Sequence, residues 1–361
     1  MKKILIVSTV SRQFYLFEQA NIEVLKSLGY EVHAAANYSD ANERLDTLDM
    51  VRHHFDIERS PFTLKNIKAY KQLKNIMQSE KFDVVHCHSP MGGVLARLAA
   101  KAVGISKVIY TAHGFHFYKG APLINWLIYY PIEKILSKFT NILLTINMED
   151  YKNAKKFKAK RIEHIPGVGV NIEKIKAIKV DKEKIRNELG VPRDSIVLLS
   201  VGELNKNKNH ETVIKALNKL INQSSQEIYY IICGRGNRRE YLEELVSSLN
   251  LKKNVIFLGF RNDVEKICKA ADIFVFPSFR EGLSVSLIEA MAAGLPIVCS
   301  EIRGNTDLVK SGVNGFLCDP TSVDDFKENI NKLINNKELR EIYGKNNIEK
   351  SEQYSIKVVK E

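Results

Sequence analysis

Two acidic residues, Glu281 and Glu289, stand on either side of a predicted turn from a strand to a helix. The segment 272–277, apolar from Ile273 on, is typical of a buried strand, and the apolar residues of 287–291 follow a helical period. Glu281 therefore belongs to the loop and Glu289 to the helix. In an open α/β sheet, ligands bind outside the carboxyl ends of the strands, where a helix start offers unpaired N–H groups. We expect one carboxylate to meet a substrate while the helix start holds an anion.

A second candidate for chemistry is the loop Gly202-Glu-Leu-Asn-Lys-Asn-Lys-Asn-His210, between a predicted strand and a predicted helix. Such a turn can hold a phosphate group, with Lys206 and Lys208 as cations. A solvated loop is the alternative, because lysine and asparagine are common in turns. Arg235, in Gly234-Arg-Gly236 at another strand end, is either a phosphate contact or a surface side chain. The motif lacks a third glycine and gives only weak support for dinucleotide binding.

Four histidines lie at the carboxyl ends of two predicted strands, as the pairs His86 with His88 and His113 with His116. Zinc ligation is one interpretation, since imidazole and thiolate bind zinc. Successive strand residues point to opposite faces, however, which keeps His86, Cys87 and His88 from converging. Structural histidines are a second interpretation. We favour a third, in which His113, followed by glycine, reaches as a donor into a cleft between domains.

Strand and helix patterns alternate along both halves of the chain. Helical patterns such as 14–28 and 210–221 separate the strands, so the pattern predicts βαβ units and mostly parallel sheets. The predicted strands are 4–7, 31–36, 53–57, 83–88, 107–111, 142–146 and 161–165, then 196–201, 228–233, 254–258, 273–276, 297–300 and 315–317.

The length of 361 residues favours two domains. We predict a Rossmann-like domain over 1–170, a lysine-rich linker over 171–192 and a second Rossmann-like domain over 193–340. A helical tail over 341–361 is expected to cross back to the first domain. An active site between two doubly wound domains is therefore expected.

The net charge of +12 implies an acidic partner, which is nucleic acid, anionic lipid or a phosphorylated small molecule. No recognised RNA- or DNA-binding module occurs, so a nucleic-acid partner is not expected. The basic residues concentrate in two runs. Between 65 and 74, lysines at every third position make one helix face, either solvated or in contact with a membrane surface. The second run comprises Lys152, Lys155, Lys156, Lys158, Lys160 and Arg161.

The five cysteines are scattered without a Cys-x-x-Cys motif, which is typical of reduced core residues. The apolar run after Lys2 and Lys3 is too short for a signal peptide, and no run reaches the ~18–20 residues of a membrane span. The segment 115–130 holds the only tryptophan and three tyrosines. Its rings suit either a water–lipid boundary or the core.

Together with Lys208 and His113, the stretch from Glu281 to Glu289 resembles the retaining glycosyltransferases of family 4. Their GT-B fold has two Rossmann-like domains that face each other across a cleft. The resemblance covers nearly the whole chain. In that family, Glu-x7-Glu opens the nucleotide-sugar subdomain, a basic loop holds the diphosphate, and a histidine of the first domain faces the transferred sugar. The run Tyr110-Thr-Ala-His-Gly-Phe-His-Phe-Tyr-Lys-Gly-Ala-Pro122 is similar to bacterial capsular and exopolysaccharide transferases that use lipid-linked acceptors.

The resemblance implies catalytic roles for His113, at the sugar, and for Glu281, near the sugar hydroxyls. Glu289 is expected to accept hydrogen bonds from the ribose hydroxyls. The other implied donor contacts are at the diphosphate, the base and the sugar: Gly202, Lys206, Lys208, Arg235, Phe260, Arg261, Gly282, Leu283 and Ser284.

Two loops depart from the family pattern. The family's Gly-Arg-Leu reads Gly202-Glu203-Leu204 here, so Lys206, Arg235 or Arg280 is expected to replace the missing arginine. The first loop, Thr9-Val-Ser-Arg-Gln-Phe14, lacks the family's glycine pair. Either Arg12 serves the donor phosphates or this loop faces the acceptor.

The resemblance implies a cytoplasmic enzyme on the inner face of the membrane. It would move a hexose or N-acetylhexosamine from a UDP-sugar to a saccharide on polyprenyl diphosphate, with retention of anomeric configuration. Lysine and helix-start amides can stabilise the departing diphosphate, so we expect neither a metal ion nor a cofactor. The alternatives are a sugar-nucleotide epimerase or a soluble transferase of the same fold, a nucleic-acid-binding protein, and a zinc enzyme.

Overall fold

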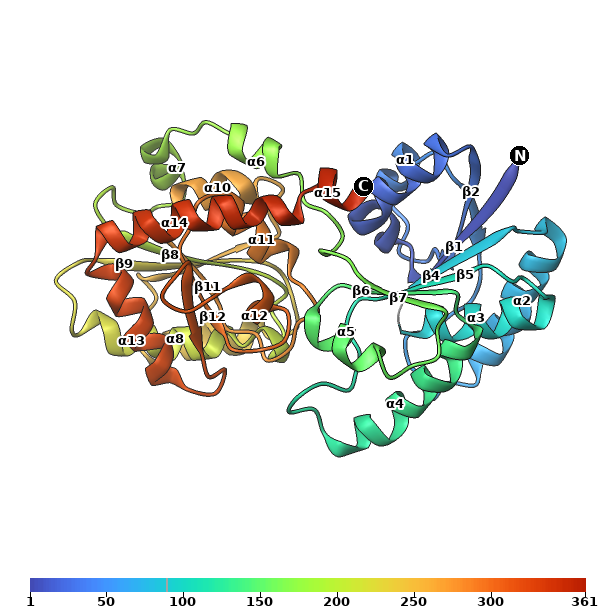
Figure 1. The fold of residues 1–361 in the computed structure, drawn as a ribbon. Helices are drawn as coiled ribbons and strands as arrows, with labels where there is room; N and C mark the ends of the chain where they lie inside the picture. The colour runs from blue at the N-terminus through green and yellow to red at the C-terminus, as the bar shows by residue number, and fades with distance from the viewer. Residues whose placement is uncertain (89) are drawn as a thin grey trace. The chain divides into compact units, whose positions relative to one another are not determined.

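The computed structural model describes residues 1–88 and 90–361. The chain forms two compact units (Figure 1). Unit 1 comprises Met1–Gly169 together with Ile356–Glu361, and unit 2 comprises Val170–Ser355. The sequence placed the end of the first domain at 170, within one residue of this division.

The sheet of unit 1 has seven parallel strands in the order β3-β2-β1-β4-β5-β6-β7. All seven predicted strands are confirmed. β3 begins two residues earlier and ends three residues earlier than the predicted 53–57, and Phe55 and Ile57, which follow the strand, are buried in the core. The strands are β1 (Lys2–Val10), β2 (Tyr30–Asn37), β3 (Val51–His54), β4 (Val84–His88), β5 (Val108–Ala112), β6 (Ile142–Thr145) and β7 (Arg161–His164).

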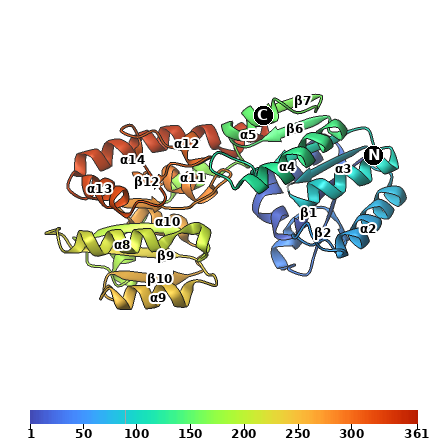
Figure 2. The ribbon, with the colours of Figure 1, turned by 90° about the horizontal axis from the view of Figure 1, so that it is seen from below.

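Helices cover both faces of this sheet, with α1 on one side and α2 and α3 on the other (Figure 1). Figure 2 shows α2, α3 and α4 side by side. The predicted helix 14–28 begins as a π-helical turn, η1. The helical elements are η1 (Phe14–Glu18), α1 (Gln19–Ser27), η2 (Glu43–Thr47), α2 (Lys65–Glu80), α3 (Met91–Val103), α4 (Leu123–Leu136), η3 (Ser137–Phe139), α5 (Met148–Ala154) and α15 (Ile356–Lys360).

Unit 2 has six parallel strands in the order β10-β9-β8-β11-β12-β13, all of them predicted. The strands are β8 (Ile196–Val201), β9 (Ile228–Cys233), β10 (Val255–Gly259), β11 (Ile273–Phe276), β12 (Ile297–Ser300) and β13 (Gly315–Cys318). The helical elements are α6 (Ile172–Ala177), α7 (Lys182–Glu188), η4 (Lys206–Lys208), α8 (His210–Ile221), α9 (Arg239–Ser248), α10 (Val264–Ala270), α11 (Val285–Ala292), α12 (Asn305–Leu308), α13 (Val323–Ile334), α14 (Lys337–Ser351) and η5 (Glu352–Tyr354).

Two apolar clusters fill the faces of the second sheet. One gathers α8, α9 and α13, and the other gathers α6, α10 and α11. The five cysteines are free and buried, as the sequence predicted. Among the described residues, none of the helices has both the length and the apolar character that a bilayer crossing requires.

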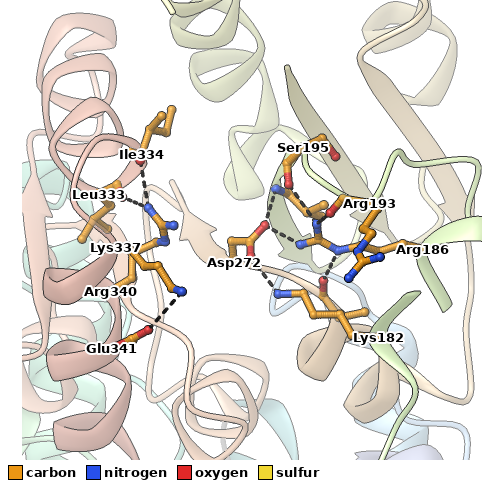
Figure 3. Close-up of polar contacts among 12 residues, drawn as sticks. Lys182, Arg186, Arg193, Ser195, Asp272, Leu333, Ile334, Lys337, Arg340 and Glu341 are labelled. Atoms are coloured by element: carbon orange, nitrogen blue, oxygen red, sulfur yellow. Dashed lines mark hydrogen bonds and ion pairs between the residues drawn. The ribbon is translucent and has the colours of Figure 1, made fainter. Parts of the chain in front are cut away.

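Residues 171–192, which the sequence suggested as a linker, form α6 and α7 and belong to unit 2. A buried ion pair fastens α7, in which Arg186 Nη2 lies 2.6 Å from Asp272 Oδ2 (Figure 3). Arg186 also donates to the carbonyls of Ala270 and Ser195. The polar composition of this segment does not indicate that one of its arginines, Arg186, is only 4% exposed.

The predicted return of the C-terminus involves fewer residues than expected. α14 stays in unit 2, and the chain rejoins unit 1 only at Ile356. There α15 lies beside α1, and Lys360 Nζ donates to Glu23 Oε2 at 2.6 Å (Figure 1).

Removing the charge of Asp272 is expected to destabilise unit 2. Asp272→Asn leaves the buried Arg186 guanidinium without its counter-charge, which costs ~3–5 kcal/mol. Urea unfolding followed by circular dichroism measures this loss. The control is Glu183→Gln on the same helix, whose pair with Arg193 is exposed and worth ~0–1 kcal/mol. Equal midpoints for the two variants would contradict the role assigned to the Asp272 pair.

Candidate active site

The strand order of unit 2 reverses between β8 and β11, which makes the carboxyl ends of these strands a switch point where ligands bind in such sheets. Two loops leave from there, and each contributes one charged side chain. Lys208 Nζ lies 2.7 Å from Glu281 Oε1. The two side chains are only 18% and 13% exposed. The structure thus brings together two residues that the sequence had assigned to one site from separate motifs.

The lysine is held by close packing rather than by its charge alone. A Cβ atom on Gly202 would lie 3.2 Å from Lys208 Cδ and Cε, so the glycine leaves room for the lysine stem. Lys208 Nζ also lies 4.6 Å from the centre of the Phe276 ring, within cation–π range. The Asn205 side chain accepts a hydrogen bond from the backbone N–H of Lys208 and fixes the turn η4.

The loop that carries Glu281 is fastened from a third strand end. Arg303, which follows β12 and is 7% exposed, donates from Nε to the Glu281 carbonyl at 3.1 Å. A Cβ on Gly304 would lie 2.1 Å from the Gly282 carbonyl oxygen, so these loops touch backbone to backbone. Our sequence reasoning missed Arg303, although its place after a buried strand was a usable signal.

The residues after Glu281 form the start of α11, as predicted. Ser284 is the N-cap and its hydroxyl accepts from the backbone N–H of Leu287, which leaves Gly282 and Leu283 in the turn before the helix. Glu289, on the second turn, is partly buried. Within residues 1–88 and 90–361, its carboxylate has no hydrogen bond or ion pair. Burial, and then the charge of Glu265, raise the Glu289 pKa to about 7.

The remaining predicted donor contacts lie at the exposed rim of unit 2. Arg235 is exposed, with its guanidinium 6.0 Å from the Phe260 ring centre, and the Phe260 ring is 57% exposed. Arg261 makes two hydrogen bonds to Asp263. Lys206 is exposed and lines a separate polar cavity with Arg238.

The carboxylate that replaces the family's arginine is also exposed. Glu203 accepts from Asn205 Nδ2 at 3.1 Å, and within the described part of the chain it pairs with no lysine or arginine. Arg280 is exposed and contributes a backbone carbonyl to Asn207. Neither Lys206, Arg235 nor Arg280 joins the Lys208–Glu281 pair.

Unit 1 has its own switch point, between β1 and β4, and His113 lies at this edge of the sheet. His113 Nε2 is 2.9 Å from His88 Nδ1 and 3.2 Å from Gln13 Nε2. Behind them, Glu18 Oε2 is 3.4 Å from His88 Nε2, and both side chains are 1% exposed. The sequence had singled out His88 but neither Glu18 nor Gln13, which the π-helical turn η1 brings to one side.

The zinc interpretation can be compared with these contacts. His86 and His88 lie on one face of β4, beside Glu18 of η1. One possible ligand atom from each of these three residues lies within 4.8 Å of the other two. Cys87 points to the opposite face, into the apolar core, as strand alternation required. His86 Nε2 bonds Thr111 Oγ1 at 2.8 Å, and His88 Nδ1 bonds His113. Protein partners therefore occupy His86 Nε2 and His88 Nδ1, whereas His88 Nε2 is buried and makes no hydrogen bond within the described part of the chain.

Comparison with known proteins decides the family. Residues 3–147 match the family model "Glycosyl transferase 4-like", and residues 181–350 match "Glycosyl transferases group 1". The EpsD protein of Bacillus subtilis (strain 168) is 38% identical over 343 residues, which cover 94% of this chain and 89% of EpsD. The chain belongs to the family 4 glycosyltransferases.

Other relatives of this glycosyltransferase have named activities. A UDP-Gal:alpha-D-GlcNAc-diphosphoundecaprenol alpha-1,3-galactosyltransferase of Escherichia coli is 35% identical over 75% of this chain and 70% of its own. Among solved structures, HepE of Anabaena in complex with UDP and glucose matches with a TM-score of 0.81 at 21% identity, over 100% of this chain and 97% of HepE. The glycosyltransferase has the GT-B fold of two Rossmann-like domains.

Glu289 predicts an unusual pH dependence of stability for this glycosyltransferase. Its folded pKa of about 7 lies above the ordinary value of 4.5, so ionising the carboxyl costs more in the folded state. The contribution of Glu289 to the free energy of unfolding has its full value below pH 4.5. It decreases by about 3 kcal/mol as the pH rises through 7. Lys174 and Glu265 are the other charges that act on it.

The neutral variant Glu289→Gln lacks this loss. Urea unfolding at pH 5 and pH 8 should show the variant gaining clearly more stability over the wild type at pH 8 than at pH 5, because most of the loss develops between these two pH values. Glu240→Gln, at an exposed position of α9, serves as the control with no such gain. A difference between variant and wild type that is the same at both pH values would refute the assignment.

Proposed function

We propose that this glycosyltransferase moves a sugar from a UDP-sugar to a lipid-linked saccharide, with retention of configuration, during assembly of a bacterial surface polysaccharide. The observation that carries the proposal is the Lys208–Glu281 pair at the switch point of unit 2. The named activity of the Escherichia coli relative supports the donor and the acceptor class. A Campylobacter jejuni relative, 24% identical, is named for transfer to a diphospho-undecaprenol saccharide.

The ion pair suits a site that must exchange one anion for another. Without a donor, Glu281 neutralises Lys208, so neither partly buried charge is unpaired. When a diphosphate arrives, it competes for Lys208 Nζ. The freed Glu281 carboxylate then accepts hydrogen bonds from the sugar hydroxyls and stabilises positive charge on the ring. Glu289, whose carboxylate has no hydrogen bond or ion pair with the residues that the structure describes, accepts from the ribose hydroxyls, and the exposed Phe260 offers a face to the base.

The transfer passes through an oxocarbenium-like transition state. The bond between the sugar C1 and the diphosphate oxygen breaks, and a bond from C1 to the acceptor oxygen forms on the same face. The acceptor proton goes to the departing phosphate, and Lys208 and the backbone N–H groups at Gly282, Leu283 and Ser284 stabilise the charge that develops there. His113 keeps its proposed contact with the sugar. We propose that no divalent cation and no cofactor take part.

Substitutions at the pair are expected to reduce transfer more than they reduce stability. Removing one well-placed electrostatic group costs ~10²–10³ in rate, so Lys208→Ala and Glu281→Gln should each lower kcat by that factor. The measurement is sugar transfer from a UDP-sugar to a polyprenyl-diphosphate saccharide and to a soluble saccharide. Lys252→Ala, at an exposed lysine between α9 and β10 that is not among the expected donor contacts, is the control. Wild-type turnover in either pair variant would exclude this site.

We also propose that unit 1 contacts an anionic membrane surface through α4. The rings of Trp126 and Tyr130 pack inward against the core, which is one of the two alternatives that the sequence left open for the aromatic segment. The opposite face of α4 is aliphatic instead. Leu123, Leu127 and Ile135 are 73%, 64% and 55% exposed.

Lysines flank this aliphatic face. The backbone N–H of Lys158 donates to Ser137 Oγ just after α4, which places the second basic run at the end of that helix. Lys101, Lys138 and Lys160 line a cavity of about 280 Å³ that includes no carboxylate. The basic face of α2 is a weaker candidate, because Lys65 and Lys68 already pair with Glu58 and Asp56. Apolar side chains beside lysines bind anionic lipid surfaces.

Vesicle sedimentation tests this surface. Each lysine near an anionic membrane is worth ~1 kcal/mol, so replacing Lys155, Lys156 and Lys158 by alanine should weaken binding to phosphatidylglycerol vesicles by ~10²-fold. Leu127→Asn should weaken it further. Ile342→Asn, which changes an apolar residue of unit 2 that is 48% exposed, is the control. Unchanged binding by the lysine variant would remove the membrane proposal.

A further inference from the structure

The buried contacts behind His113 specify where the protons lie. Glu18 Oε2 is the polar atom that faces His88 Nε2, at 3.4 Å, and Asn21 Nδ2 donates to the same oxygen at 2.7 Å. A lone pair on His88 Nε2 would repel the carboxylate, so this nitrogen carries a proton. Both groups are 1% exposed, so water does not compensate either charge.

Gln13 determines, through His113, whether the other nitrogen of His88, Nδ1, carries a proton. The Gln13 amide nitrogen can only donate, and it lies 3.2 Å from His113 Nε2. The same amide nitrogen lies 3.4 Å from Glu18 Oε1, and turning the amide over would place its oxygen against that carboxylate. His113 Nε2 is therefore an acceptor. Its contact of 2.9 Å with His88 Nδ1 then requires a proton on His88 Nδ1.

We propose that Glu18 and His88 form a buried carboxylate–imidazolium pair that keeps His113 neutral with its proton on Nδ1. Glu18 is then a positioning residue that acts on His113 through His88. A ring protonated on Nδ1 offers an N–H there and cannot take up the acceptor's proton at that atom. On the proposed function, His113 therefore contacts the sugar as a hydrogen-bond donor rather than as a base.

The charges in this cluster agree with that arrangement. Burial would raise the Glu18 pKa, but the charge of His88 and the contributions of His86 and Asn21 lower it to about 2. Burial, and then the charge of His88, lower the pKa of His113 to about 4. The same two causes lower the pKa of His86 to about 3. One cationic imidazole among three, paired with one carboxylate, leaves the cluster neutral.

Nitrogen-15 NMR of the full chain with labelled histidine reads these protons directly. The chain has nine histidines, and His88→Asn and His113→Asn assign the two that matter. At pH 7 we expect both nitrogens of His88 and only Nδ1 of His113 to be protonated. In Glu18→Gln, His88 should lose one proton and His113 should lose its single tautomer. Glu23→Gln, which removes an exposed carboxylate of the adjoining helix α1, should change neither ring.

Three outcomes would overturn the proposal: a neutral His88 in the wild type, an unchanged spectrum in Glu18→Gln, or one zinc ion per chain with metal-shifted histidine signals. If Glu18→Gln does not fold, the wild-type spectrum still decides. The kinetic arm rests on the proposed function, where Glu18→Gln should lower kcat by ~10² with an unchanged KM for the donor. Protons as proposed but no transfer from any nucleotide sugar would refute the proposed function and leave the pair standing.

Discussion

The ion pair between Lys208 and Glu281 is the interaction on which the rest of unit 2's site depends. Three loops, each at a strand's carboxyl end, are shaped so that these two side chains can meet. Gly202 leaves room for the lysine stem, Asn205 fixes the turn that carries it, and Arg303 fastens the loop of its partner. An ion pair with little solvent contact is stable only when both charges remain compensated. A ligand that takes one partner must therefore satisfy the other, which is what we propose for a sugar diphosphate.

The two carboxylates of Glu-x7-Glu differ in their partners. Glu281 is paired with a cation, whereas Glu289 is partly buried and its pKa is raised to about 7 because burial penalises its charge. Such a group costs folding stability at neutral pH, and its persistence is consistent with a ligand that supplies the missing hydrogen bonds. Glu18 in unit 1 differs from Glu289, because its buried carboxylate lies beside His88, which compensates the charge within the protein.

Much of this could be predicted from the sequence, because buried parallel strands read as continuous apolar runs and their carboxyl ends mark the site. That reasoning predicted site roles for Lys208, Glu281, Glu289 and His113, and the structure brings Lys208 and Glu281 together. It could not find Glu18, because a helix read with a period of 3.6 does not anticipate the π-helical turn that brings this residue beside Gln13. The same reasoning assigned α7 to a linker. The composition of the segment does not show that one of its many charged residues, Arg186, is buried in an ion pair with Asp272.

The most direct test of the central claim compares nucleotide fragments by calorimetry. If Lys208 holds the diphosphate, UDP binds the wild type far more tightly than uridine does. In Lys208→Ala, the affinity for UDP should fall by at least tenfold while the affinity for uridine stays the same. Equal affinities of UDP for the two proteins, or an equal loss for UDP and uridine, would contradict the account.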